Sequence, residues 1–197
     1  MRQRWACVVV GAWLALGVGC AEEGGGGDDG TQDAGTPLPT CVPRAKAEPL
    51  VDNTAWVMSS SQEDPFDDRP AEPTCGEGGS KVESGILEVN TGLCGYFTAH
   101  QPTLREVQPC ETIEAVIAYY PLFAAERAEA HVALAVDDEV VWEGRVPIPS
   151  PSGYLTARWV PGRVVPAGSK VSFHLHNHGT NDWRFLYLSV GGEDPPP

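Results

Sequence analysis

Hydrophobic and polar residues alternate over much of the chain, which is the pattern of β-strands that bury one face. In residues 112–120 and 130–136, apolar side chains recur at every second position. Asp137 and Asp138 then interrupt the alternation and are typical of a tight turn between two paired strands. Between residues 41 and 193, no segment has a sustained helical period with capping residues. The pattern therefore predicts an all-β domain.

About eight strands, separated by turns rich in Pro and Gly, predict a single antiparallel β-sandwich or jelly roll. Residues 59–80 contain three prolines and three glycines and are expected to form one long loop. Residues 122–129 are expected to form a second loop or a single turn. The segments with strand character are 55–58, 85–89, 95–99, 112–120, 129–136, 140–146, 154–160, 171–176 and 183–190.

The end of the domain resembles a known fold. Residues 174–190 read HLHNHGTNDWRFLYLSV and are similar to the final hairpin of galactose-binding-like jelly rolls, which closes with a polar turn and an aromatic-rich strand. Domains of that family are mostly modules that bind carbohydrate or protein. The resemblance therefore implies a binding function, although a fold alone does not determine what is bound.

The first nineteen residues have the features of a secretory signal peptide. Arg2 and Arg4 precede an uncharged apolar run, residues 5–18, which is shorter than the roughly 20 residues that a membrane-spanning helix needs. The run ends in Leu-Gly-Val-Gly before Cys20, which resembles the lipobox of bacterial lipoproteins. In that family the peptidase cuts before the cysteine, and its thiol carries diacylglycerol.

Lipidation of Cys20 is the preferred interpretation of this segment. Gly17 stands where the lipobox usually has Leu, so ordinary cleavage near Gly19 or Ala21, with Cys20 incidental, is the alternative. Residues 20–40 are acidic and rich in Gly, a composition that cannot bury enough apolar surface to fold. We therefore expect a lipidated cysteine and flexible linker over 20–40, a folded domain over 41–193, and a disordered tail over 194–197.

The predicted location is the bacterial cell envelope, where the lipid anchor would hold the protein on the outer membrane. The chain is acidic, with 27 Asp and Glu against 13 Lys and Arg and a net charge of −14. Nucleic acid is not expected as a partner, because its binding requires a positive surface that displaces counterions. The expected partners are the membrane, through the anchor, and carbohydrate or another envelope protein.

Four cysteines remain in the predicted domain: Cys41, Cys75, Cys94 and Cys110. An even number in an exported domain predicts two disulfides, for which three pairings exist. We prefer Cys75–Cys94 nested inside Cys41–Cys110. Zinc is the rival interpretation, but no two of these cysteines have the short spacing that zinc sites show.

A histidine-rich strand is the strongest candidate for metal chemistry. Strand alternation places His174, His176 and His178 on one face, with Phe173 and Leu175 on the other. Imidazoles on one face can converge on Zn²⁺ or Cu²⁺. The alternative is a polar sheet face whose histidines contact their neighbours or a ligand, and no cofactor is then required.

Residues for a carbohydrate site are also present near this strand. His176, Asn181 and Trp183 can supply the aromatic and amide groups that suit the apolar faces and polar rims of sugars. Further aromatic candidates are Trp142, Trp159 and Tyr154. The alternative places most of the tryptophans in the hydrophobic core.

No catalytic motif is recognisable. The chain has no Gly-x-Ser-x-Gly sequence, and its many acids make any carboxylate pair uninformative for glycoside hydrolysis. Acids of the long loop can in principle hold Ca²⁺, but they match no EF-hand spacing and are expected to be solvated: Glu63, Asp64, Asp67, Asp68 and Glu72. We therefore expect a non-catalytic binding or structural domain, with a metal-binding protein or the accessory domain of a secreted hydrolase as alternatives.

Overall fold

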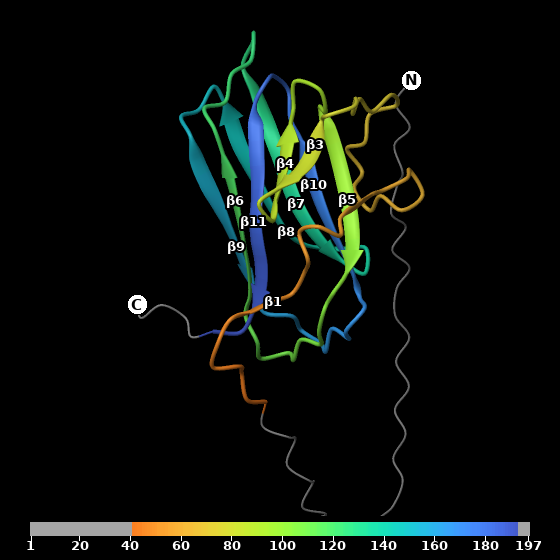
Figure 1. Ribbon diagram of the computed structural model, residues 1–197, viewed down its shortest axis with the longest axis vertical. Coiled ribbons are helices and arrows are strands. Elements are labelled where there is room, and N and C mark those ends of the chain that lie inside the picture. Colours follow the sequence, from red (N-terminus) through yellow and green to blue (C-terminus); the bar gives the residue numbers. More distant parts are fainter. Residues whose placement is uncertain (1–40, 193–197) are drawn as a thin grey trace, which may run out of the picture. The chain divides into compact units, whose positions relative to one another are not determined.

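The computed structural model describes residues 41–192, which form two antiparallel sheets packed face to face (Figure 1). These residues contain eleven strands and no helix. The strands are β1 (Glu48–Pro49), β2 (Val57–Met58), β3 (Ser80–Glu83), β4 (Ile86–Asn90), β5 (Tyr96–Pro102), β6 (Ile113–Tyr119), β7 (Ala128–Val136), β8 (Glu139–Ile148), β9 (Gly153–Trp159), β10 (Lys170–His176) and β11 (Asp182–Val190).

The two sheets have different strand orders, and all pairings are antiparallel. The first sheet runs β3-β4-β11-β6-β9, with β1 paired to the end of β11. The second runs β2-β5-β10-β7-β8. The predicted all-β sandwich is therefore confirmed, and each sheet has an inner face toward the core and an outer face.

Alternation along the strands assigns the core. Val171, Phe173 and Leu175 of β10 are buried between the sheets, whereas Ser172 and His174 lie on the outer face of the second sheet. Burying a large apolar side chain contributes about 1.5–3 kcal/mol, so this inner layer is the main source of stability. The predicted turn at Asp137 and Asp138 is confirmed, since both residues have positive φ values of 50° and 68°.

Two short strands were not expected from the sequence. β1 has only two residues, and β3 has three exposed residues out of four, so neither shows an alternating apolar face. The long segment before β3 has no strand between residues 59 and 79, as predicted. The second expected loop, predicted over 122–129, spans residues 120–127, because residues 128 and 129 belong to β7. In residues 41–192, no helix is long and apolar enough to cross a membrane.

Two disulfides join the loops of the sandwich, Cys75–Cys94 and Cys41–Cys110, which is the preferred pairing. Cys110 lies just before β6, and the amide of Gly192 donates to the carbonyl of Arg44 at 3.1 Å. The chain therefore joins the domain beside the last residues of β11. Residues 1–40 and 193–197 lie outside the described part, and with them the predicted signal peptide, the Cys20 anchor, the linker and the tail.

Candidate functional site

A long loop covers part of the outer face of the second sheet, over β5, β10 and β7. We call residues 59–73 the strap. It begins where the amide of Ser59 donates to the carbonyl of Thr98 at 2.8 Å. Further along, Phe66 is buried against Ala133 and Ala135 of β7, and its ring stacks on His174 with centroids 4.5 Å apart. The strap therefore has a small apolar contact of its own, separate from the main core.

An ion pair and two hydrogen bonds fix the shape of the strap around Asp64. This carboxylate lies 2.6 Å from the guanidinium of Arg69 and accepts a hydrogen bond of 2.8 Å from the hydroxyl of Tyr96. It also accepts from the amide of Phe66 at 3.1 Å. Burial raises the pKa of Tyr96, which keeps its hydroxyl protonated as a donor. These contacts position the following residues of the strap over the sheet.

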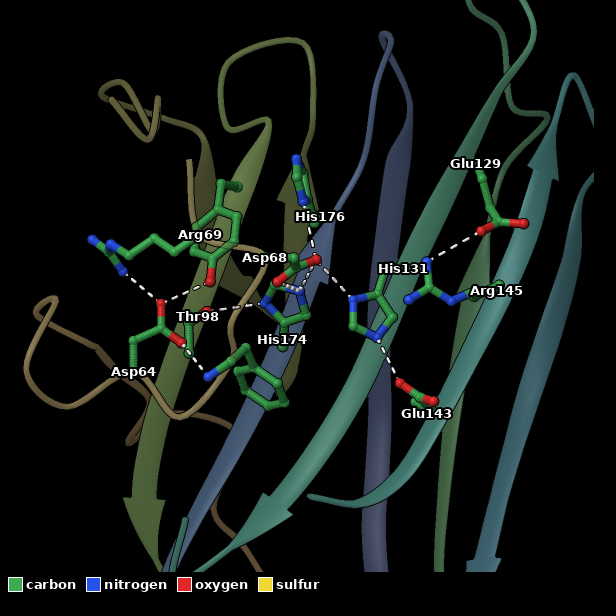
Figure 2. Close-up of polar contacts among 12 residues, drawn as sticks. Asp64, Asp68, Arg69, Thr98, Glu129, His131, Glu143, Arg145, His174 and His176 are labelled. Carbon is green, nitrogen blue, oxygen red and sulfur yellow. Dashed lines mark hydrogen bonds and ion pairs between the residues drawn. The ribbon is translucent and has the colours of Figure 1, made fainter. Parts of the chain in front are cut away.

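Three histidines of the sheet converge on one carboxylate of the strap (Figure 2). Oδ2 of Asp68 lies 2.8 Å from Nδ1 of His131 on β7 and 3.1 Å from Nδ1 of His176 on β10. Nε2 of His174 lies 3.2 Å from Oδ1 and 3.3 Å from Oδ2 of the same carboxylate. We call Asp68, His131, His174 and His176 the His/Asp cluster.

Two of these histidines contact the protein through their other ring nitrogen as well. Nε2 of His131 lies 3.2 Å from the carboxylate of Glu143 on β8. Nδ1 of His174 lies 3.1 Å from the hydroxyl of Thr98 on β5. The register explains the arrangement, because His174 pairs with Thr98 on one side and with Ala133 on the other, and Ala133 pairs with Glu143. The small Ala133 leaves room between the larger neighbours.

The cluster combines a buried base with a partly buried acid. His174 has no exposed surface, and this burial lowers its pKa despite the neighbouring carboxylate. Burial alone would raise the pKa of Asp68, but hydrogen bonds from His174 and His131 outweigh it and hold that pKa far below its usual range. Asp68 is thus an anion that the histidines surround.

Of the three histidines predicted to bind a metal, the structure brings only two into the His/Asp cluster. His174 and His176 share the outer face of the second sheet, as the alternation predicts. His178 lies beyond the end of β10 and is exposed, with its ring centroid 4.8 Å from that of His176. The structure adds two residues to the group, Asp68 and His131. His131 is the one polar residue of the apolar run 130–136, which was a visible signal, whereas nothing in the sequence distinguished Asp68 from the other acids of its loop.

The residues named for a sugar site lie in different places. Trp183 is fully buried in the core and packs against Tyr119 with centroids 4.8 Å apart. Asn181 is buried, and its side-chain oxygen accepts a hydrogen bond of 2.6 Å from the amide of Phe123. His176 belongs to the His/Asp cluster on the second sheet. For Trp183, the alternative interpretation, in which the tryptophan belongs to the hydrophobic core, is therefore confirmed.

A groove crosses the outer face of the first sheet. Its two adjoining hollows have volumes of about 390 and 220 Å³, and both are lined by Tyr120 and Arg184. Tyr154 lines the larger hollow and is 72% exposed. The guanidinium of Arg184 lies 4.8 Å from the ring centroid of Tyr120. We call this feature the tyrosine groove; its other lining residues are Gly78, Lys81, Glu88, Asn90, Ala118, Tyr119, Ser152, Gly153 and Asp182.

Strand register explains why these side chains form one surface. Arg184 of β11 pairs with Ala118 of β6 on one side and with Glu88 of β4 on the other. Tyr154 of β9 also pairs with Ala118, so a small alanine separates the arginine from the tyrosine. Glu88 holds the guanidinium of Arg184 at 2.8 Å. The groove is therefore lowest at Ala118, with the ring of Tyr154 on one side and the paired Arg184 and Glu88 on the other.

A larger cleft of about 670 Å³ lies beside β1. Several of its polar side chains are already bonded within the protein: the hydroxyl of Tyr187 donates to Glu114 at 2.6 Å. The amide of Asn53 likewise donates to the carbonyls of Gly85 and Leu186, both at 3.0 Å. In the tyrosine groove, by contrast, the side chains of Tyr154 and Asp182 have no hydrogen-bond partner within residues 41–192. These two side chains are thus free to contact a polar ligand, although Arg184 and Glu88 of the groove are paired with each other.

No protein-family model matches the chain, and neither does any curated protein. Among solved structures, PfGH50B is similar with a TM-score of 0.41 and 10% identity, over 76% of this chain and 24% of that chain. A CBM4 structure has a TM-score of 0.38 and 12% identity, over 74% and 95% of the two chains.

TmCBM61, solved in complex with β-1,4-galactotriose, has a TM-score of 0.34 and 9% identity, over 72% of this chain and 91% of its own. This chain thus spans less than a quarter of PfGH50B and most of the two smaller proteins. At these levels of similarity, the matched structures assign neither a ligand nor an activity to this chain.

Proposed function

We propose that this protein is an exported, lipid-anchored binding protein whose β-sandwich domain holds carbohydrate in the tyrosine groove. The observation that carries the proposal is the exposure of Tyr154, at 72%, beside an arginine in a groove of the sheet face. A large aromatic ring so exposed contributes nothing to the core. It is available for stacking against the C–H face of a sugar ring.

The polar groups of the groove suit the hydroxyls of the same ligand. Arg184 has several N–H donors in a planar fork, and Asp182 is an exposed acceptor close to it on β11. Asn90 pairs with Asp182 across the sheet and adds an amide. Donors and acceptors beside aromatic rings are the combination that fixes the orientation of a sugar. The groove is open and shallow, which fits part of a chain better than a small enclosed molecule.

Anchoring is the second part of the proposal and rests on residues 1–40 alone. A lipid on Cys20 would hold the protein on the bacterial outer membrane, and the acidic linker would separate the domain from it. We propose no catalytic role for the domain. An accessory domain of a secreted hydrolase would also bind carbohydrate, and it would differ in acting beside a catalytic partner.

Binding is tested with the purified protein on a glycan array, followed by titration calorimetry with the best ligand. Tyr154→Ala and Tyr120→Ala should each weaken binding about tenfold, because a stacking contact is worth roughly 1–1.5 kcal/mol. Tyr187→Ala is the matched control, since it removes an exposed tyrosine from the same sheet outside the groove. An array without ligands, or equal losses in all three variants, would refute the groove. Turnover of a substrate by the protein would refute the non-catalytic role.

A further inference from the structure

We propose that Asp68, His131 and His174 form a binding site for a divalent transition metal, with Zn²⁺ as the best-suited ion and His176 as the fourth ligand. This site is independent of the tyrosine groove, since it lies on the outer face of the other sheet. It also differs from the three-histidine site expected from the sequence, because it includes His131 and Asp68 and does not use His178.

The inward-facing atoms are already close to the positions that a metal requires. One ligand atom each of Asp68, His131 and His174 lies within 4.8 Å of the others. Zinc binds imidazole nitrogen and carboxylate oxygen at ~2.0–2.2 Å, so tetrahedral ligands stand roughly 3.3 Å apart. Small side-chain rotations, of about 1 Å at the ligand atoms, would bring the three together around an ion. His176 can join them, since its Nδ1 lies 3.1 Å from Asp68.

The ring nitrogens of His131 and His174 that point away from Asp68 are also held by hydrogen-bond partners. Metal-bound histidines almost always donate their second N–H to a carboxylate, carbonyl or similar acceptor, which fixes the tautomer and the ring orientation. His131 meets this condition with Glu143 at 3.2 Å, and His174 meets it with the hydroxyl of Thr98 at 3.1 Å. Each ring thus presents one nitrogen to the centre while the other is held by the sheet.

Hydrogen bonds alone do not satisfy the carboxylate oxygens of Asp68 at the centre of the cluster. Three imidazole nitrogens crowd around Asp68, and all three lie within 3.3 Å of Oδ2. Oδ1 is buried and has no hydrogen bond of good geometry, although Nε2 of His174 is 3.2 Å away. A cation at this point would replace the crowded contacts with bonds to all four side chains.

The ligand types select the class of ion. Three imidazoles and one carboxylate favour Zn²⁺, Cu²⁺ or Ni²⁺, whereas Ca²⁺ and Mg²⁺ prefer oxygen ligands alone. Four ligands from protein side chains would close a tetrahedral site and leave no position for a substrate, which is typical of structural zinc. Because Asp68 belongs to the strap and the histidines belong to the sheet, the metal would fasten the strap to the sheet.

The test uses the full protein after treatment with a chelator. Titration calorimetry with Zn²⁺ should give one ion per chain, and Co²⁺ should give the visible absorption of a tetrahedral site. His131→Ala and Asp68→Asn should each weaken Zn²⁺ binding by about a hundredfold or more, and Glu143→Gln by about 10–100-fold. The matched controls are His100→Ala, on the same sheet face but bonded to Ser59, and His178→Ala. Both controls should bind Zn²⁺ as the wild type does.

Several results would overturn the proposal. These are a wild type that binds no Zn²⁺, a His178→Ala variant that loses binding while His131→Ala keeps it, and an unchanged affinity in Glu143→Gln. Glu143 has a 60% exposed side chain, so its replacement tests the site even if the His131 variant does not fold. Circular dichroism of each metal-free variant separates lost ligands from lost structure. Sugar binding should be unaffected throughout, because the tyrosine groove lies on the other sheet.

Discussion

Oδ2 of Asp68 lies 2.8 Å from Nδ1 of His131, although 63 positions separate the two residues in the sequence. The contact joins a loop without regular structure to the middle of a sheet. It depends on Asp64, whose contacts with Tyr96 and Arg69 set the path of the strap before it reaches Asp68. Asp64 and Asp68 together with the buried Phe66 therefore hold the strap against the sheet.

Metal-free protein should lose stability in two stages as the pH falls. Burial lowers the pKa of His174, so below about pH 6.5 the folded protein binds fewer protons than the unfolded chain, and the free energy of unfolding decreases. Asp68, whose folded pKa is also lowered, contributes stability that is complete above about pH 4 and is lost progressively as the pH falls below that value toward the folded pKa. Urea unfolding in the presence of a chelator, at a series of pH values, measures both stages.

Asp68→Asn separates the two contributions. The variant should be about 2 kcal/mol less stable than the wild type at neutral pH, because it loses hydrogen bonds to a charged group. It should also lack the lower stage of the acid profile. In the wild type, a free energy of unfolding that stays constant from about pH 8 to pH 4 would contradict the expected role of His174, and one that does not fall further below about pH 4 would contradict that of Asp68.

The disulfide between Cys75 and Cys94 should stabilise the domain by restricting the unfolded chain. It closes a separation of 19 residues, for which the expected contribution is about 3 kcal/mol. Replacing both cysteines with Ser should lower the midpoint of urea unfolding by a corresponding amount. Non-reducing peptide mapping of the wild type provides the control, and free thiols at these positions in exported protein would contradict the prediction.

The lipid anchor has its own test. In the wild type, Cys20 should carry diacylglycerol, and the protein should sediment with the membrane fraction. Cys20→Ser should move it to the soluble fraction while the domain keeps its fold and ligand binding. Mass spectrometry of the N-terminal peptide identifies the modification. Membrane association that persists in a correctly processed Cys20→Ser protein would show that something other than this lipid holds it.

Most of the sandwich could be predicted from the sequence, because a strand with one buried face repeats its apolar residues with a period of two. Residues 171–176 and 130–136 show this period, and both form strands with the expected faces inward. β1 and β3 escaped notice because their residues are mainly exposed and carry no such period. They are held by pairing with β11 and β4, which depends on the folded partner.

The sites were harder to predict because they depend on which strands are neighbours. Alternation placed His174 and His176 together, but no local pattern could show that β7 would bring His131 beside them. Likewise, Tyr154 was recognised as a candidate, whereas its proximity to Arg184 follows from the position of β6 between β9 and β11. Local periodicity determines which way a side chain points, and strand order determines what it meets.

The position at which the chain joins the domain has a mechanical consequence. Arg44 and β1 lie beside Val190 and Gly192 at one end of β11, whereas Asp182 and Arg184 of the tyrosine groove lie at its beginning. A nine-residue strand is roughly 25–30 Å long, so these points are at opposite ends of the sheet. Tension between a captured ligand and an anchor before Cys41 would act along the strands. The domain would then be loaded in shear across its hydrogen bonds, the direction in which antiparallel sheets resist separation most strongly.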